Sequence, residues 1–266
     1  MLKLVDTHTH LYLSQFDADR ETVVRNARAA GVRQMLMPNI DSHTAGPMLS
    51  VARQFPGICL PMMGLHPTSV KATWRSELDH IESWLGKGGF VAIGETGMDL
   101  YWDTSFAPAQ AESLERHIGW ALKFGLPLVL HSRNALNEIF DILQACRGQG
   151  LKGVFHCFPG DASQAAKAID MGFLLGVGGV LTYKNSQMAG VAKYAALSDM
   201  VLETDAPFLA PEPHRGKRNE SAFLLAIAQR LAEIKGMDVD EVAATTTRNA
   251  VKLFALNQKV PKTETP

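Results

Sequence analysis

The sequence predicts an α/β fold, namely a single (β/α)8 barrel of the TIM type with an additional helix at its C-terminal end. Three observations favour this fold. Short runs of Val, Ile, Leu and Met recur along the chain, with stretches of helical spacing between them. Within the runs apolar and polar residues do not alternate, as is typical of parallel strands that are buried on both faces. The chain has 266 residues, close to the roughly 250 of one such barrel.

Eight apolar runs are expected to form the strands. In chain order they cover residues 2–7, 33–37, 58–64, 90–94, 127–130, 152–156, 173–177 and 200–204. A glycine stands just before several of them, for example Gly89, Gly125 and Gly172. Because no linker separates these units, they favour one closed barrel over a doubly wound sheet with an added domain.

The segments between the runs carry helix signals. Asp17 is expected to cap a helix that ends at Gly31. Asp238 stands at the expected start of the additional C-terminal helix, which reaches about Phe254. His117, like two other histidines in helical stretches, is expected at the surface or at an interface.

Composition and charge narrow the class of protein. The hydrophobic fraction of 46% and the charged fraction of 20% are typical of a globular protein with a sizeable core. We expect a single domain at residues 1–256 and a flexible tail at 257–266. The 26 basic and 27 acidic residues nearly cancel, which argues against a protein that coats nucleic acid. The three cysteines form no disulfide framework, and no apolar run approaches the roughly 20 residues of a membrane span. We therefore expect a cytoplasmic protein that does not associate with a membrane and has no obligate protein partner.

Polar residues stand where the apolar runs end. Six of the eight runs end in a potential metal ligand or in a charged or imidazole group. The motifs in chain order are D-T-H-T-H from Asp6, G-L-H-P from Gly64, G-E-T-G-M-D from Gly94, H-S-R from His131, H-C-F from His156 and E-T-D-A-P from Glu203. In a barrel the C-terminal ends of all strands lie on one rim, so these residues are expected to converge there.

Two of these motifs suggest metal ligands directly. His8 and His10 are two residues apart on an extended strand, so their side chains share a face and can chelate one ion. The alternative is a pair of hydrogen-bonded histidines. A carboxylate such as Glu95 at the end of a buried strand is costly unless it is paired or bound to metal, and it could bridge two cations. Its alternative is a salt bridge, for instance to Arg133.

Three further residues complete the predicted site. His131 and His156 follow adjacent predicted strands, and Asp205 follows the eighth strand beside the first. A lone histidine in such a position is more often a core residue than a ligand. Four histidines and two carboxylates on one rim together predict a site for two divalent cations, whether Mg²⁺, Mn²⁺ or Zn²⁺. Asp205 could ligate a metal, accept a proton from a bridging water, or do both.

Other residues near the rim are candidates for binding substrate. Arg133 could clamp a phosphate, with a structural pairing to Glu95 or Asp99 as the alternative. His66 could contact substrate, donate a proton to a leaving oxygen, or support another residue. Arg215 belongs to a basic run that could steer a polyanionic end into the site, although such runs are usually solvated loops. Trp102 could stack on a base, or could simply be a packing residue.

The order of these motifs resembles that of the TatD-like metal-dependent deoxyribonucleases, which belong to the amidohydrolase-type barrels. The resemblance includes G-V-G-G-V-L-T-Y and R-G-K-R-N-E and spans residues 6 to about 255. This chain departs from the family pattern at Met98, Pro159 and Ser221, none of which is a proposed ligand. Pro159 could alter a loop that faces the substrate.

The resemblance implies a role for each candidate residue. It implies that His8, His10 and Asp205 bind a first metal, that Glu95 bridges, and that His131 and His156 bind a second metal. The implied activity is phosphodiester hydrolysis on DNA, with nucleotides removed from an end by a metal-activated water, and with Asp205 and Glu95 as the catalytic residues.

Two alternatives to a nuclease remain from the sequence. The first is an amidohydrolase-type barrel enzyme that acts on a cyclic amide or lactone. Many of these use a modified lysine at the fourth strand, where this chain has Glu95. The second is a metal-binding scaffold without catalysis, which six intact ligands at strand ends argue against.

Overall fold

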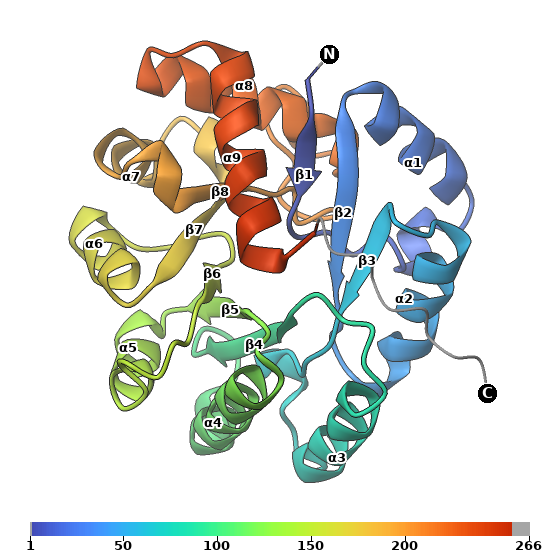
Figure 1. The fold of residues 1–266 in the computed structure, drawn as a ribbon, viewed down its shortest axis with the longest axis vertical. Helices are drawn as coiled ribbons and strands as arrows, with labels where there is room; N and C mark the ends of the chain where they lie inside the picture. The colour runs from blue at the N-terminus through green and yellow to red at the C-terminus, as the bar shows by residue number, and fades with distance from the viewer. Residues whose placement is uncertain (1, 257–266) are drawn as a thin grey trace.

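The computed structural model describes residues 2–256, and its parallel strands lie inside a layer of helices (Figure 1). The predicted tail at 257–266 lies outside the described residues. The strands in chain order are β1 (Leu4–Asp6), β2 (Val32–Pro38), β3 (Cys59–Met62), β4 (Ile93–Asp99), β5 (Leu128–Arg133), β6 (Gly153–Phe155), β7 (Phe173–Val177) and β8 (Met200–Leu202).

Backbone hydrogen bonds join the strands into a ring. The strands pair in the orders β1-β2-β3 and β4-β5-β6-β7-β8. At one seam the Thr7 N–H donates to the Leu202 carbonyl at 3.1 Å, and at the other the Gly94 N–H donates to the Met63 carbonyl at 2.8 Å. The predicted (β/α)8 barrel is therefore confirmed.

Helices follow the strands in alternation. The α-helices of residues 2–256 are α1 (Arg20–Ala29), α2 (Ser42–Gln54), α3 (Trp74–Leu85), α4 (Ala107–Phe124), α5 (Leu136–Gln144), α6 (Ala162–Asp170), α7 (Met188–Tyr194), α8 (Leu224–Lys235) and α9 (Val239–Phe254). Short 3₁₀ helices lie at η1 (Ser14–Phe16), η2 (Pro67–Ser69), η3 (Thr104–Phe106), η4 (Gly179–Thr182), η5 (Leu197–Asp199) and η6 (Ser221–Phe223). None of the helices in this described range is long and apolar enough to span a membrane.

The additional helix α9 closes the N-terminal end of the ring. The Asn249 amide donates to the carbonyls of Leu197 and Met200 at the start of β8, and Thr247 donates to the Lys3 carbonyl before β1. Phe254 packs in an apolar cluster with residues from around the ring, so this cluster lies inside it. The opposite, C-terminal end of the ring is left for polar residues.

Two local predictions were wrong. The fourth strand was expected at residues 90–94, whereas β4 covers Ile93–Asp99, because backbone pairing with β5 continues through polar residues and glycines. Asp17 does not cap α1, since Asp19 occupies the N-cap position. The Asp17 carboxylate instead pairs with Arg20 at 2.5 Å. The prediction for α9 is confirmed, because the Asp238 side chain accepts from the Asp240 N–H.

His117 is a buried core residue and not the surface or interface residue that was expected. Its Nε2 accepts from the Leu65 N–H at 3.0 Å, and its Nδ1 donates to the Ser113 carbonyl at 2.7 Å. Burial lowers the pKa of His117 from 6.5 to about 4. The neutral imidazole thus links α4 to the segment after β3, and a proton added to Nε2 would break that link.

We expect acid to destabilise the fold partly through His117. The folded state binds a proton on His117 more weakly than the unfolded state does. The free energy of unfolding therefore falls as the pH drops below 6.5, and the loss, about 3 kcal/mol in all, is nearly complete around pH 4. His117→Gln keeps one acceptor and one donor without titrating. Urea unfolding at several pH values should give a shallower acid slope for this variant, and equal slopes would contradict the assignment.

Candidate metal centre

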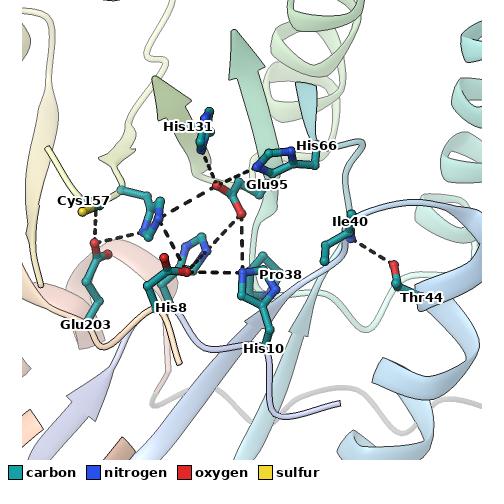
Figure 2. Close-up of polar contacts among 12 residues, drawn as sticks. His8, His10, Pro38, Ile40, Thr44, His66, Glu95, His131, Cys157 and Glu203 are labelled. Atoms are coloured by element: carbon teal, nitrogen blue, oxygen red, sulfur yellow. Dashed lines mark hydrogen bonds and ion pairs between the residues drawn. The ribbon is translucent and has the colours of Figure 1, made fainter. Parts of the chain in front are cut away.

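The six predicted ligands converge at the C-terminal rim of the barrel. They come from five strands or from the short segments that follow them: His8 and His10 after β1, Glu95 in β4, His131 in β5, His156 after β6 and Asp205 after β8. Figure 2 shows the Glu95 carboxylate at the centre, with imidazoles directed toward it. The chain therefore brings together all six residues that the sequence singled out.

The first group of ligand atoms surrounds one oxygen of Glu95. Its Oε2 lies 3.0 Å from His8 Nε2 and 3.8 Å from His10 Nε2. Asp205 Oδ1 lies 3.4 Å from His10 Nε2 and 3.8 Å from His8 Nε2. Ligands that hold one divalent cation at about 2.1 Å are roughly 3–3.4 Å apart, so a small contraction would fit these atoms to an ion.

The second group faces the other oxygen of the same carboxylate. Glu95 Oε1 lies 3.1 Å from His131 Nδ1 and 3.5 Å from His66 Nε2. His156 Nε2 lies between the two groups, 4.0 Å from Glu95 Oε1 and 3.8 Å from Asp205 Oδ1. The two oxygens of Glu95 thus point to different sets of imidazoles (Figure 2). A carboxylate in this orientation can bridge two cations.

The position of Glu95 follows from an irregularity in β4. Between Ile93 and Thr96 this strand has one more residue than the paired segment of β5, and such an irregularity re-aims a side chain. Gly97 lets the two strands approach closely, because a Cβ there would lie 2.0 Å from the His131 carbonyl oxygen.

A hydrogen bond with Tyr12 orients the candidate ligand His10. The Tyr12 hydroxyl donates to the Pro38 carbonyl at 2.6 Å, so it must accept from His10 Nδ1 at 2.8 Å. The proton of a neutral His10 is therefore on Nδ1, and the lone pair of Nε2 points into the cluster. Metal-binding imidazoles are commonly held by such a partner on the other nitrogen.

Two acids lie close to further imidazoles, on the nitrogen that faces away from the centre of the cluster. His156 Nδ1 lies 2.9 Å from Glu203 Oε1, and His131 Nε2 lies 3.1 Å from Asp99 Oδ2. Gly176 makes room for the Glu203 carboxylate, since a Cβ there would lie 2.6 Å from its Oε2. The sequence marked both acids as strand-end residues, but it gave no signal of which histidine each would contact.

His66 differs from the other imidazoles in its protonation. Its Nδ1 accepts from the Thr68 N–H at 3.2 Å, so a neutral His66 carries its proton on Nε2. That nitrogen is directed at Glu95 Oε1. His66 therefore presents a donor to the site, whereas His10 presents a lone pair.

Charges within the cluster hold protons that a cation would displace. Burial would raise the pKa of Glu95, but the imidazoles of His8 and His66 more than offset it and keep this pKa well below its usual range. Burial would lower the pKa of His156, but Glu203 and Asp205 raise it to about 10. Loading a metal on the Nε2 of His156 would therefore release a proton.

A buried acid that the sequence analysis did not select joins the first and last strands. The Asp6 carboxylate accepts from the Thr204 hydroxyl at 2.6 Å, from the Thr204 N–H at 2.9 Å and from the His8 N–H at 3.3 Å. Burial raises the pKa of Asp6 to about 7. This contact fixes the segment of His8 against that of Asp205.

The two arginines that were predicted near the rim, Arg133 and Arg215, each lie against a different tyrosine ring. Arg133 does not make the predicted alternative pairing with Glu95 or Asp99 among the described residues, and its Cζ lies 3.6 Å from the centre of the Tyr101 ring. Arg215 is exposed, with its Cζ 4.5 Å from the Tyr183 ring.

The barrel and this cluster define the class of protein to which the chain belongs. A ring of parallel strands with imidazoles and carboxylates gathered at its C-terminal rim is the architecture of metal-dependent barrel proteins. The sequence model of the family described as TatD related DNase matches residues 5–255. The chain belongs to this family, as the motifs at the strand ends predicted.

Individual relatives agree with this assignment. The chain is 34% identical over 255 residues to the uncharacterized metal-dependent hydrolase YabD of Bacillus subtilis, covering 96% of this chain and 100% of that protein. It is 32% identical over 260 residues to the 3'-5' ssDNA/RNA exonuclease TatD of Erwinia tasmaniensis, covering 95% and 100%. The crystal structure of YjjV, a TatD homologue from Escherichia coli, superposes with a TM-score of 0.89 at 27% identity, covering 95% and 98%.

We expect Tyr12→Phe to weaken metal binding without unfolding the barrel. The variant removes the acceptor that holds His10 Nδ1, and loss of such a partner typically lowers metal affinity about 10- to 100-fold. Calorimetric titration of the metal-free protein with Mn²⁺ measures this affinity directly. Tyr194→Phe changes an exposed tyrosine of α7 and is the matched control. An unchanged affinity in Tyr12→Phe would contradict the assigned role of Tyr12.

Proposed function

We propose that this protein is a divalent-metal-dependent exonuclease that hydrolyses phosphodiester bonds at the end of a DNA strand. The orientation of Glu95 carries the proposal, because its two oxygens face separate groups of imidazoles. A bridging carboxylate of this kind suits the two-metal hydrolysis of phosphodiesters. The name of the Erwinia tasmaniensis relative, an exonuclease on single-stranded DNA and RNA, supports the same reaction.

We assign two divalent cations to the site. His8, His10 and Asp205 would hold the first, His131 and His156 would hold the second, and Glu95 would bridge them. This set contains imidazoles and carboxylates but no thiolate, which suits Mg²⁺, Mn²⁺ or Zn²⁺.

The reaction would use the residues around this centre in distinct roles. The bound cations would lower the pKa of a water and neutralise charge on the phosphate. Burial would raise the pKa of Asp205, but His156 and the contact with His10 lower it overall, so this carboxylate is ionised and can accept the proton of the attacking water. His66 would donate a hydrogen bond from its Nε2 to the leaving oxygen and stabilise the charge that develops there.

Two arginines would bind the strand outside the metal centre. Arg133 lies with its face on Tyr101, which leaves the N–H groups at the edge of its guanidinium for a phosphate. Arg215 is exposed at 61% and would attract the polyanion, consistent with the role predicted for it. Arg218 of the same basic run is held by Asp19 at 2.7 and 2.8 Å and has a structural role instead.

Hydrolysis of a cyclic amide or lactone is the alternative that the activity test must exclude. The position that a modified lysine takes in many such enzymes is occupied here by Glu95 in β4. A single experiment compares end-labelled single-stranded DNA with a panel of lactones, each with Mg²⁺ or Mn²⁺ and with a chelator. Shortening of the DNA that stops when the chelator is added supports the proposal. Intact DNA together with rapid lactone turnover would instead identify the protein as a lactone hydrolase.

We expect Glu95→Ala to abolish hydrolysis of the labelled DNA. The variant removes the one side chain that faces both groups of ligands, so both ions should be lost or displaced. Circular dichroism should remain that of the folded barrel, since the core does not depend on this carboxylate. Near-normal turnover in Glu95→Ala would refute the bridging role.

We expect His66→Ala to lower kcat while both metals stay bound. Removing a positioned hydrogen-bond donor to a developing negative charge typically costs about 10²- to 10³-fold in rate. Metal content per protein chain, measured by elemental analysis, distinguishes a donor from a ligand. Loss of one metal from His66→Ala would show that His66 is a ligand, contrary to the proton position inferred from Thr68.

A further inference from the structure

The turn after β4 exposes two adjacent aromatic rings at the rim. Tyr101 is 52% exposed and Trp102 is 70% exposed, and both are among the most exposed large hydrophobic side chains of residues 2–256. Their rings are nearly perpendicular, with centroids 4.8 Å apart. Keeping two large aromatic surfaces in water is unfavourable for folding, so their exposure calls for another explanation.

Asp99 connects this turn to the metal centre. Its Oδ1 accepts from the Tyr101 N–H at 3.0 Å and from the Trp102 N–H at 3.4 Å, while its Oδ2 contacts His131 Nε2 at 3.1 Å. One buried carboxylate therefore fixes both the aromatic turn and a candidate metal ligand. The rings are held at a defined position next to the proposed site of hydrolysis.

Arg133 adds positive charge to the same place. Its Cζ lies 3.6 Å from the centre of the Tyr101 ring and 5.1 Å from that of Trp102. Because Arg133 covers a face of Tyr101, the more exposed Trp102 offers the freer aromatic surface. Aromatic rings beside a cationic group are the combination that binds single-stranded nucleic acid, through stacked bases and paired phosphates.

We propose that Tyr101, Trp102 and Arg133 form a stacking shelf for an unpaired base of the strand that is being hydrolysed. This inference rests on the proposed exonuclease function and gives it a substrate preference. A base within a duplex is already stacked and paired, so the shelf favours single-stranded ends over blunt duplex ends. The main stacking surface is Trp102, while Arg133 contacts the adjoining phosphate.

The test compares wild-type protein with Trp102→Ala on two single-stranded DNA probes. The first is an oligodeoxyadenylate, and the second is the same strand with abasic residues at its terminal positions, which keeps the phosphates and removes the stacking bases. We expect Trp102→Ala to raise KM for the first probe about fivefold or more and to leave KM for the abasic probe nearly unchanged. Tyr194→Ala removes another exposed aromatic residue, from α7, and should change neither value.

Fluorescence provides a second readout that does not depend on turnover. Stacking of a base on Trp102 should quench the indole emission of the Mg²⁺-loaded protein when a phosphorothioate oligodeoxyadenylate is added, and this quenching should be absent in Trp102→Phe. An unchanged KM in Trp102→Ala, or equal weakening on both probes, would overturn the shelf while hydrolysis by the wild type still stands. Failure of the wild type to hydrolyse either probe would instead overturn the proposed function, and the shelf with it.

Discussion

A buried carboxylate surrounded by imidazoles is the constraint on which the rim of this barrel depends. Glu95 is only 2% exposed, and a charge in that position is tolerable only if other groups compensate for it. Its oxygens therefore lie within reach of histidines from several strands. Those histidines in turn need partners, which explains why Tyr12, Asp99 and Glu203 are buried around them. Each of these partners restricts the orientation of the imidazole that it contacts.

The N-terminal end of the barrel stabilises the fold, whereas the C-terminal end carries the ionisable side chains of the candidate site. At the N-terminal end, Phe254 of α9 packs against valines and leucines inside the ring, and burial of this apolar surface favours folding. At the C-terminal end the interior is filled by ionisable side chains, whose desolvation opposes folding. The Asp6 contact with Thr204 holds that end together where β8 meets β1. The apolar end thus offsets the cost of a polar end that is arranged for binding metal.

Several details could not be predicted because they depend on contacts between distant segments. The apolar runs marked most strands, but the extent of β4 was missed, since its pairing with β5 carries glycines and acids into the ladder. His117 lies in a helix, as expected, yet only packing against the segment after β3 shows that it is buried. Asp99 was visible as a strand-end acid, but its contacts with His131 and with the turn at Tyr101 were not.

The sequence by itself determined which residues reach the rim. Apolar runs that end in histidine or acid specify strands with polar C-terminal ends, and a barrel places all of those ends together, so His8 and Asp205 could be assigned to one site from their order alone. Only the tertiary structure decided how each side chain is oriented and where its proton resides. The two oxygens of Glu95, the lone pair of His10 and the donor of His66 are set by neighbours from other strands, and such long-range contacts leave no periodic signal in the chain.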